Sequence, residues 1–327
     1  MATRDIKLNS TAKVGITNFL IRPEVMGGRV DFIYDKHEVS IRLPAEYDDE
    51  QASVVARITN GGAVTKVAIS SLNIQVKTTG KIAVPVEMLS SRCNAYDIAD
   101  EGLVEELDSR IFKYQHIANG AINVWLRCLR WKRNDWRVGR YGSSVGRYVD
   151  VSQVNLINRE SDKKIWHGPL HFTAPGCTAI SKECWEAVAS SLKNNETSPV
   201  YYDLLFDSEA HLDAGEIKRA LVEAAMATEI FIRTIVENRI PDNLNRNIKD
   251  YIGRISIRKV FESFLPEHLD SVQREVLSKD NNKLKSEILR LFEHRNTIMH
   301  SGVIDRLDRD LCSIHISNVK KLFAGLG

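Results

Sequence analysis

Few cysteines occur in this chain, and their spacing excludes the sites that cysteines usually build. The sequence of 327 residues contains five, an odd number, at widely separated positions: Cys93, Cys128, Cys177, Cys184 and Cys312. The set fits neither a disulfide framework nor the Cys-x-x-Cys pairs of zinc sites. We therefore expect free thiols.

Histidine does not supply a metal site either. His167 and His171 lie four residues apart in a strand-like run, which would put both side chains on one face. No cysteine or carboxylate nearby completes a ligand set, so we interpret them as two half-exposed strand residues. We predict no metal ion.

Long apolar runs and nucleotide-binding glycine motifs are also missing. No stretch reaches the roughly 18 uncharged apolar residues of a membrane span, and the N-terminus lacks a basic-then-apolar signal pattern. Neither G-x-x-x-x-G-K-S/T nor G-x-G-x-x-G occurs in a strand-to-helix setting, which leaves a nucleotide-binding sensor with little support. We expect a cytoplasmic protein with no cofactor and no membrane contact.

What is present is the composition of an ordinary globular protein. Hydrophobic residues make up 43% and charged residues 27%, with a net charge of +2. A chain of 327 residues exceeds a usual single domain, so we expect two. The polar run from Lys193 to Pro199 is the best linker, which predicts domains at residues 1–195 and 200–327.

The first domain has the pattern of a sheet with one long helix. Alternating apolar residues predict strands at Val30 to Tyr34 and Val39 to Leu43. Further strand candidates lie at 64–76, 81–86, 147–157 and 164–173. Between residues 111 and 129 apolar side chains recur every three or four positions, which is typical of an amphipathic helix. We expect a mostly-β domain with an antiparallel sheet.

Beyond residue 200 the pattern is helical. Helices are expected at 202–212, 214–238, a looser set through 247–277, then 283–300 and 307–323. Five helical segments make a bundle. The predicted fold class is therefore α+β, with a mostly-β N-terminal domain followed by an all-α C-terminal bundle.

Three polar residues, Arg295, Asn296 and His300, lie in the last turns of the helix predicted at 281–300. The apolar positions of this helix form one stripe, and Arg295 falls in the middle of it. A guanidinium is rarely buried unless it is paired, so Arg295 needs a carboxylate, a phosphate or a partner subunit. Asn296 and His300 are four residues apart and project from one flank beside Arg295.

These residues carry a resemblance to a known family. Arg295-Asn296-x-x-x-His300, followed by a small residue and Gly302, resembles the R-N-x-x-x-H signature of the HEPN superfamily. The segments 212–216 and 220–229 also resemble the paired long helices of bacterial HEPN domains. The resemblance covers residues 201–327 and implies an all-helical bundle that dimerises with the two motifs facing each other. It also implies, for many members, a metal-independent endoribonuclease, whereas other members are inactive binding modules.

The three residue types suit cleavage of RNA without a metal. His300 would take a proton from a ribose 2′-hydroxyl or give one to the leaving oxygen, because imidazole titrates near neutral pH. Arg295 would stabilise charge on the phosphoryl oxygens, and Asn296 would orient the phosphate or the imidazole. The alternative stays open that the arginine and histidine form a structural link.

Two carboxylates are predicted to support this site. Glu229 lies on the apolar face of the helix at 214–238, as Arg295 does on its own helix, so we expect an ion pair between them. Glu293, two residues before Arg295, is the second supporting carboxylate. The alternative for Glu229 is contact with a helix N-terminus or with water.

A basic and aromatic segment lies between residues 127 and 148. Seven basic residues and one acidic residue occur there, interleaved with two tryptophans and two tyrosines. Cations that follow phosphates and rings that stack on bases are what single-stranded RNA binding requires. The predicted RNA-binding residues are Arg130, Lys132, Arg133, Trp136, Arg137, Arg140 and Tyr141. The alternative is a solvated helix end whose tryptophans belong to the core.

Two functions compete for this sequence. The first is a metal-independent endoribonuclease with its site at a homodimer interface, in which the N-terminal domain recognises RNA or regulates access. Such an enzyme would act as a toxin in bacterial stress or phage defence, with room for an inhibitory or activating protein partner. The second is a non-catalytic RNA-binding or protein-interaction module that keeps the motif for dimerisation.

Overall fold

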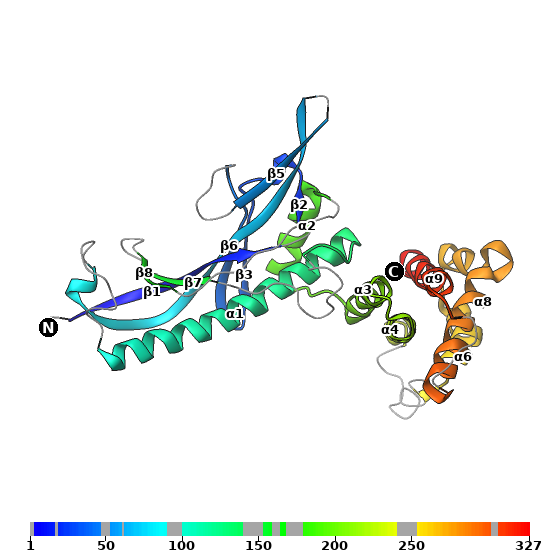
Figure 1. Cartoon of the computed structure of the whole chain (residues 1–327). Coiled ribbons are helices and arrows are strands. Elements are labelled where there is room, and N and C mark those ends of the chain that lie inside the picture. Colours follow the sequence, from blue (N-terminus) through cyan, green and yellow to red (C-terminus); the bar gives the residue numbers. More distant parts are fainter. Residues whose placement is uncertain are drawn as a thin grey trace. The chain divides into compact units, whose positions relative to one another are not determined.

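The chain forms two compact units, Met1–Ser198 and Pro199–Gly327, referred to below as the N-terminal and C-terminal units. The structure, a computed structural model, describes residues 3–16, 19–46, 53–60, 62–89, 100–139, 153–158, 164–167, 179–240, 254–301 and 307–327. The division falls inside the polar segment 193–199. The predicted α+β class is confirmed, because strands gather in the first unit and helices in the second (Figure 1).

The N-terminal unit is a sheet with helices on one face. Its strands are β1 (Thr3–Gly15), β2 (Leu20–Ile21), β3 (Arg29–Tyr34), β4 (His37–Arg42), β5 (Ser53–Asn60), β6 (Ala63–Pro85), β7 (Gln153–Asn158), β8 (Lys164–His167) and β9 (Ala179–Ile180). Its helices are α1 (Glu101–Arg133) and α2 (Lys182–Lys193), with 3₁₀ turns η1 (Pro23–Val25) and η2 (Val86–Leu89). The main strand order is β3-β4-β6-β1-β7-β8, and these neighbours are antiparallel. A short parallel pair, β2 with β9, lies off this path.

The two faces of the sheet differ because the strands alternate apolar and polar side chains. On β3, Val30 and Phe32 are buried, whereas Arg29, Asp31 and Ile33 are exposed. The apolar face packs against α1, which lies along the sheet in Figure 1. The opposite face of β3, β4 and β6 carries polar side chains.

Two of the predicted strands extend into residues that the structure does not describe. The pattern at 147–157 corresponds to β7, which begins at Gln153, and the pattern at 164–173 corresponds to β8, which ends at His167. Residues 147–152 and 168–173, with His171 among them, lie outside the described part of the chain.

The C-terminal unit is helical. Its elements are α3 (Val200–Asp213), α4 (Ile217–Glu237), α6 (Ile257–Lys259), a π-helical turn η4 (Val260–Phe264), α7 (Leu265–His268), α8 (Ser271–Ser301) and α9 (Arg309–Leu326). α4 packs against α3, α8 and α9 and buries its small and apolar face, which includes Leu221, Ala224 and Phe231. α8 begins well before the predicted residue 283. Asp270 caps its first turn by accepting a hydrogen bond from the backbone N–H of Gln273 at 2.8 Å, a signal that apolar periodicity does not contain.

Candidate functional site

The residues of the R-N-x-x-x-H motif lie in the last turns of α8. Arg295 donates a hydrogen bond from Nη1 to Oδ1 of Asn296 at 3.0 Å. Asn296 and His300 are exposed and lie one helical turn apart on the same flank. In the part of the chain that the structure describes, the His300 imidazole has no hydrogen-bond or ion-pair partner. The fold therefore leaves the imidazole available to a substrate or to a second chain.

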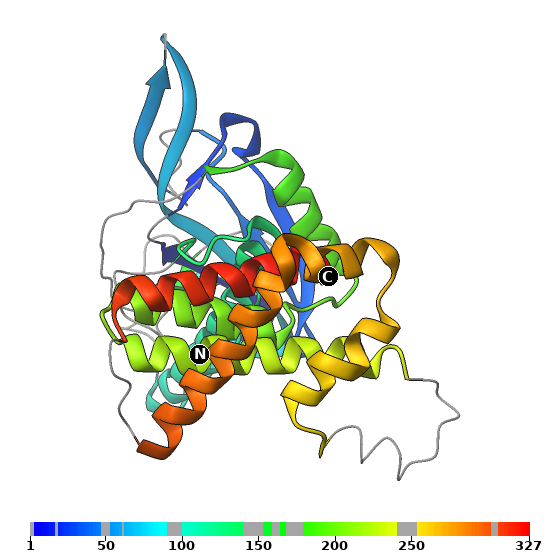
Figure 2. The same ribbon diagram turned by 90° about the vertical axis from the view of Figure 1, so that its right-hand side faces the viewer.

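Arg295 is half-buried rather than buried, because the bundle does not cover the whole apolar stripe of α8. Ile288 and Leu291 are fully buried, but Ile298 is only half-buried and Met299 is 62% exposed. Figure 2 shows the last turns of α8, in deep orange, extending past α9 in red. No carboxylate among the described residues forms an ion pair with Arg295. The end of α8 thus presents an uncovered strip of apolar and cationic surface.

The predicted ion pair between Glu229 and Arg295 is wrong. Glu229 instead bonds to Arg233, one turn further along α4, with Nη2 and Oε1 2.9 Å apart. Glu293 bonds to Arg258, with Nη2 and Oε1 3.3 Å apart on an exposed surface. A glutamate and an arginine four residues apart on one helix are neighbours in any arrangement of the bundle. A pair within one helix is therefore favoured over a pair between two helices. Such partly exposed pairs contribute at most about 1 kcal/mol.

A histidine pair that sequence reasoning missed lies directly beside the motif. His294 Nδ1 and His315 Nε2 are 3.0 Å apart, and the two rings are nearly perpendicular. His315 is 1% exposed, and burial, together with the nearby His294 and Arg290, lowers its pKa to about 4. Burial and the Arg290 guanidinium also lower the pKa of His294. Both imidazoles are therefore neutral at pH 7.

The position of the proton in this pair follows from burial. Nδ1 of His315 is buried and has no hydrogen-bond partner within the described ranges. Burying an unpaired N–H at that atom costs about 1 to 3 kcal/mol, so the favoured tautomer of His315 carries its proton on Nε2 and donates it to His294. The pair ties α8 to α9 one residue before Arg295. The sequence signal was the position of His315 on the apolar face of α9, beside Cys312, Ile316 and Val319.

A second titratable cluster, where α3 meets α4, is closed to substrate. His211 is fully buried, with Nδ1 2.8 Å from Oε2 of Glu216 and Nε2 3.3 Å from Oε1 of Glu223. Burial raises the pKa of Glu223, and the guanidinium of Arg219 approaches the same carboxylate at 3.2 Å. Both ring nitrogens of His211 already face carboxylates, so we assign this cluster to the structure of the α3–α4 hairpin.

The basic segment after α1 divides into buried and exposed residues. Arg130 is 1% exposed and donates a hydrogen bond from Nε to the carbonyl oxygen of Val138 at 2.8 Å. The prediction that Arg130 contacts RNA is therefore wrong, because its guanidinium closes the turn that follows α1. Arg137 makes a two-point ion pair with Asp135, at 3.0 and 3.2 Å, but its side chain remains 49% exposed.

The remaining predicted RNA-binding residues keep some exposure. Lys132 is exposed and lies 3.8 Å from the centre of the Trp131 ring, while Arg133 and Trp136 are half-buried. Arg140 and Tyr141 lie outside the described residues. A basic surface made of Lys132, Arg133 and Arg137 stays a prediction.

Two substitutions separate structure from RNA binding in this segment. Arg130→Met is expected to lower the stability of the N-terminal unit by about 1 to 3 kcal/mol, since it leaves the buried carbonyl of Val138 without a donor. Lys132→Ala is expected to lower stability by no more than about 1 kcal/mol, through loss of its contact with the Trp131 ring, and to weaken RNA binding, with a shallower dependence on salt. Thermal unfolding and a salt titration of RNA affinity measure both effects. Unchanged RNA affinity in the Lys132 variant would contradict the assignment of this surface to RNA.

Within the described ranges, no group of three histidine, cysteine, aspartate or glutamate side chains is placed to hold a metal ion. No helix of those ranges has the length and apolar character needed to cross a bilayer. No family model, curated protein or solved structure matches the chain. The candidate site therefore rests on the geometry of α8 and on its R-N-x-x-x-H motif.

Proposed function

We propose that the chain is a cytoplasmic, metal-independent endoribonuclease of the HEPN type, active as a homodimer of its C-terminal unit. The observation that carries the proposal is the end of α8, where a guanidinium, an amide and an imidazole reach the surface within two turns. Among described residues, the fold gives the His300 ring no other use. An exposed imidazole without a hydrogen bond or ion pair in the described part of the chain is a candidate for binding and chemistry.

The proposed reaction is attack of a ribose 2′-hydroxyl on the adjacent phosphorus. One His300 accepts the 2′-hydroxyl proton while the O2′–P bond forms, and the P–O5′ bond breaks as the leaving oxygen takes up a proton. Arg295 stabilises the negative charge on the non-bridging oxygens, and its hydrogen bond to Asn296 fixes the direction of the guanidinium. The products are a 2′,3′-cyclic phosphate and a 5′-hydroxyl end.

A dimer supplies what one copy of the chain lacks. The reaction needs a base and an acid, and two copies of α8 across a two-fold axis would provide two His300 side chains. The uncovered strip at Arg295, Ile298 and Met299 supports an interface at this position. The basic surface of the N-terminal unit would hold the RNA strand. A role in bacterial stress or phage defence would follow from the family.

The dimer is tested by placing a charge on the strip. Met299→Glu is expected to shift the protein from dimer to monomer at micromolar concentration, because it replaces an apolar side chain of the contact with a carboxylate that pairs with Arg295, four residues earlier on α8, and not with the partner chain. Sedimentation velocity measures the shift. Val272→Glu is the matched control, since Val272 lies at the opposite end of α8 and is 69% exposed. A wild-type monomer, or a Met299→Glu dimer, would contradict this interface.

The alternative function is a non-catalytic RNA-binding or protein-interaction module. One observation favours this alternative: no carboxylate of the described residues bonds to the His300 ring, whereas a catalytic histidine is usually oriented by such a bond. Incubation of purified protein with single-stranded and structured RNA in excess EDTA separates the two functions. The enzyme is expected to cut RNA under these conditions, whereas a binding module retains RNA intact.

A further inference from the structure

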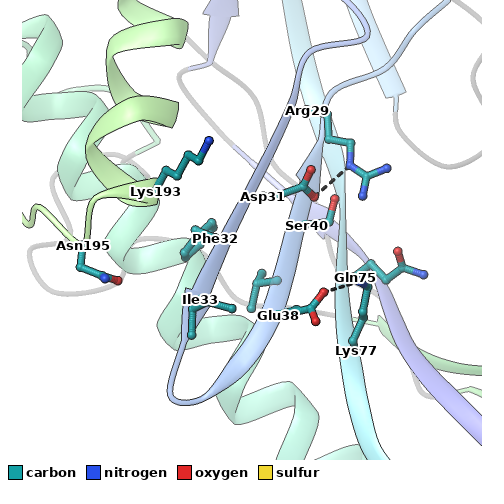
Figure 3. A pocket seen from close by; sticks show the side chains of 11 residues that line it. Arg29, Asp31, Phe32, Ile33, Glu38, Ser40, Gln75, Lys77, Lys193 and Asn195 are labelled. Atoms are coloured by element: carbon teal, nitrogen blue, oxygen red, sulfur yellow. Dashed lines mark hydrogen bonds and ion pairs between the residues drawn. The ribbon is translucent and has the colours of Figure 1, made fainter.

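The strand at one edge of the sheet, β3, borders a pocket of about 410 Å³. The pocket is lined on one side by β3, β4 and β6, and on the other by the C-terminal end of α2 (Figure 3). Lys193 and Asn195 approach β3 from the α2 side, whereas Lys77 lies on the sheet side. The pocket therefore borders β3 both on the side of the sheet and on the side of α2.

The register of the β3–β4 hairpin shows which backbone groups face this pocket. Tyr34 pairs with His37 across a two-residue turn in which both residues have positive φ, so Tyr34 exchanges hydrogen bonds with β4. At the other end, the N–H of Leu43 donates to the carbonyl of Gly28 at 2.9 Å. The hydrogen bonds of Tyr34 and of Gly28 therefore both show that the even-numbered residues of this strand bond to β4. The N–H and C=O groups of Asp31 and Ile33 therefore point away from β4.

These outward groups are not used by the rest of the described chain. β3 ends the main strand order, and in the described ranges no group hydrogen-bonds to the backbone of Asp31 or Ile33 from the open side. A row of unpaired N–H and C=O groups on a strand edge is a template for another strand. The pocket leaves space beside part of this edge.

The side chains around the edge indicate the chemistry of the occupant. Arg29 pairs with Asp31 at 2.9 Å, and Lys77 pairs with Glu38, so these four charges cancel. The Lys193 ammonium has no ion-pair partner within the described residues, which leaves one positive charge. On β3, the side chain of Ile33 is 55% exposed. An extended peptide that alternates acidic and apolar residues complements both features.

We propose that β3 binds an extended, acidic segment of a partner protein as an added strand. Its backbone pairs with Asp31 and Ile33, its acidic side chains face Lys193, and its apolar side chains pack beside Ile33. This inference does not depend on the proposed ribonuclease activity.

The test uses the full-length chain and a synthetic peptide of alternating glutamate and valine. In the free chain, the amide protons of Asp31 and Ile33 are expected to exchange with solvent faster than those of Phe32 and Tyr34. Adding the peptide is expected to protect the first two amides. A peptide with N-methylated backbone amides, and one with lysine in place of glutamate, are both expected to bind at least tenfold more weakly.

Two pairs of variants separate backbone pairing from charge. Ile33→Pro removes an outward N–H that β4 does not use and is expected to abolish peptide binding. Ile33→Ala keeps that N–H and is expected to weaken binding only by the loss of apolar contact. Lys193→Glu is expected to weaken binding about tenfold, and Lys182→Glu, on the same helix but beside Glu186, is the matched control. Slow exchange of Asp31 and Ile33 in the free chain, or equal affinity in all four variants, would overturn the proposal. Self-association that Ile33→Pro abolishes would also overturn it, in favour of a second copy at this edge.

Discussion

Replacing His300 with alanine is expected to lower the rate of RNA cleavage by about two to four orders of magnitude, the usual contribution of a general acid or base. The stability of the protein is expected to change by no more than about 0.5 kcal/mol, because His300 is exposed and makes no hydrogen bond or ion pair within the described residues. Single-turnover cleavage of a labelled RNA and thermal unfolding measure the two quantities.

The matched control is His116→Ala, which removes an exposed histidine from α1 in the N-terminal unit. It is expected to leave both the cleavage rate and stability unchanged. A His300→Ala protein that cuts RNA at the wild-type rate would remove His300 from the reaction, and the surface of α8 would then be a binding site only.

Acidification is expected to destabilise the C-terminal unit through the buried imidazole of His315. Its pKa is about 4 in the folded chain and 6.5 for an ordinary histidine, so between these values the unfolded state binds the proton and the folded state does not. Stability therefore falls as the pH decreases from 6.5 toward 4. At about 1.4 kcal/mol for each pH unit, the loss is about 3 kcal/mol.

Hydrogen exchange of the α9 amides measures this loss in the full-length chain, because all five tryptophans lie in the N-terminal unit and do not report on α9. A His315→Leu variant is the control, since it removes the titrating group and is expected to flatten the dependence on pH. An equally steep dependence in the variant would assign the acid sensitivity to other groups.

The fold class and one feature of the candidate site were accessible from the sequence. Apolar periodicity follows directly from burial on one face, so it located the hairpin of β3 and β4 and the helix α1. The spacing of Asn296 and His300 fixed their shared flank, because helical geometry alone determines it.

Features that depend on tertiary contact were not accessible in the same way. Arg295 lies on the apolar stripe, but the sequence does not show that the bundle stops covering the stripe near Phe292. Arginine is a residue type that commonly binds RNA, yet the guanidinium of Arg130 donates a hydrogen bond to the backbone carbonyl of Val138, eight residues later. The partner of His294 comes from another helix, so no local pattern identifies it.

The chemical ends of the RNA products in excess EDTA test the central claim most directly. Attack by the 2′-hydroxyl without a metal predicts 2′,3′-cyclic phosphate or 3′-phosphate ends, 5′-hydroxyl ends, and no cleavage of DNA of the same sequence. Products with 3′-hydroxyl ends, or RNA that stays uncut in EDTA but is cut after a divalent metal is added, would contradict the account.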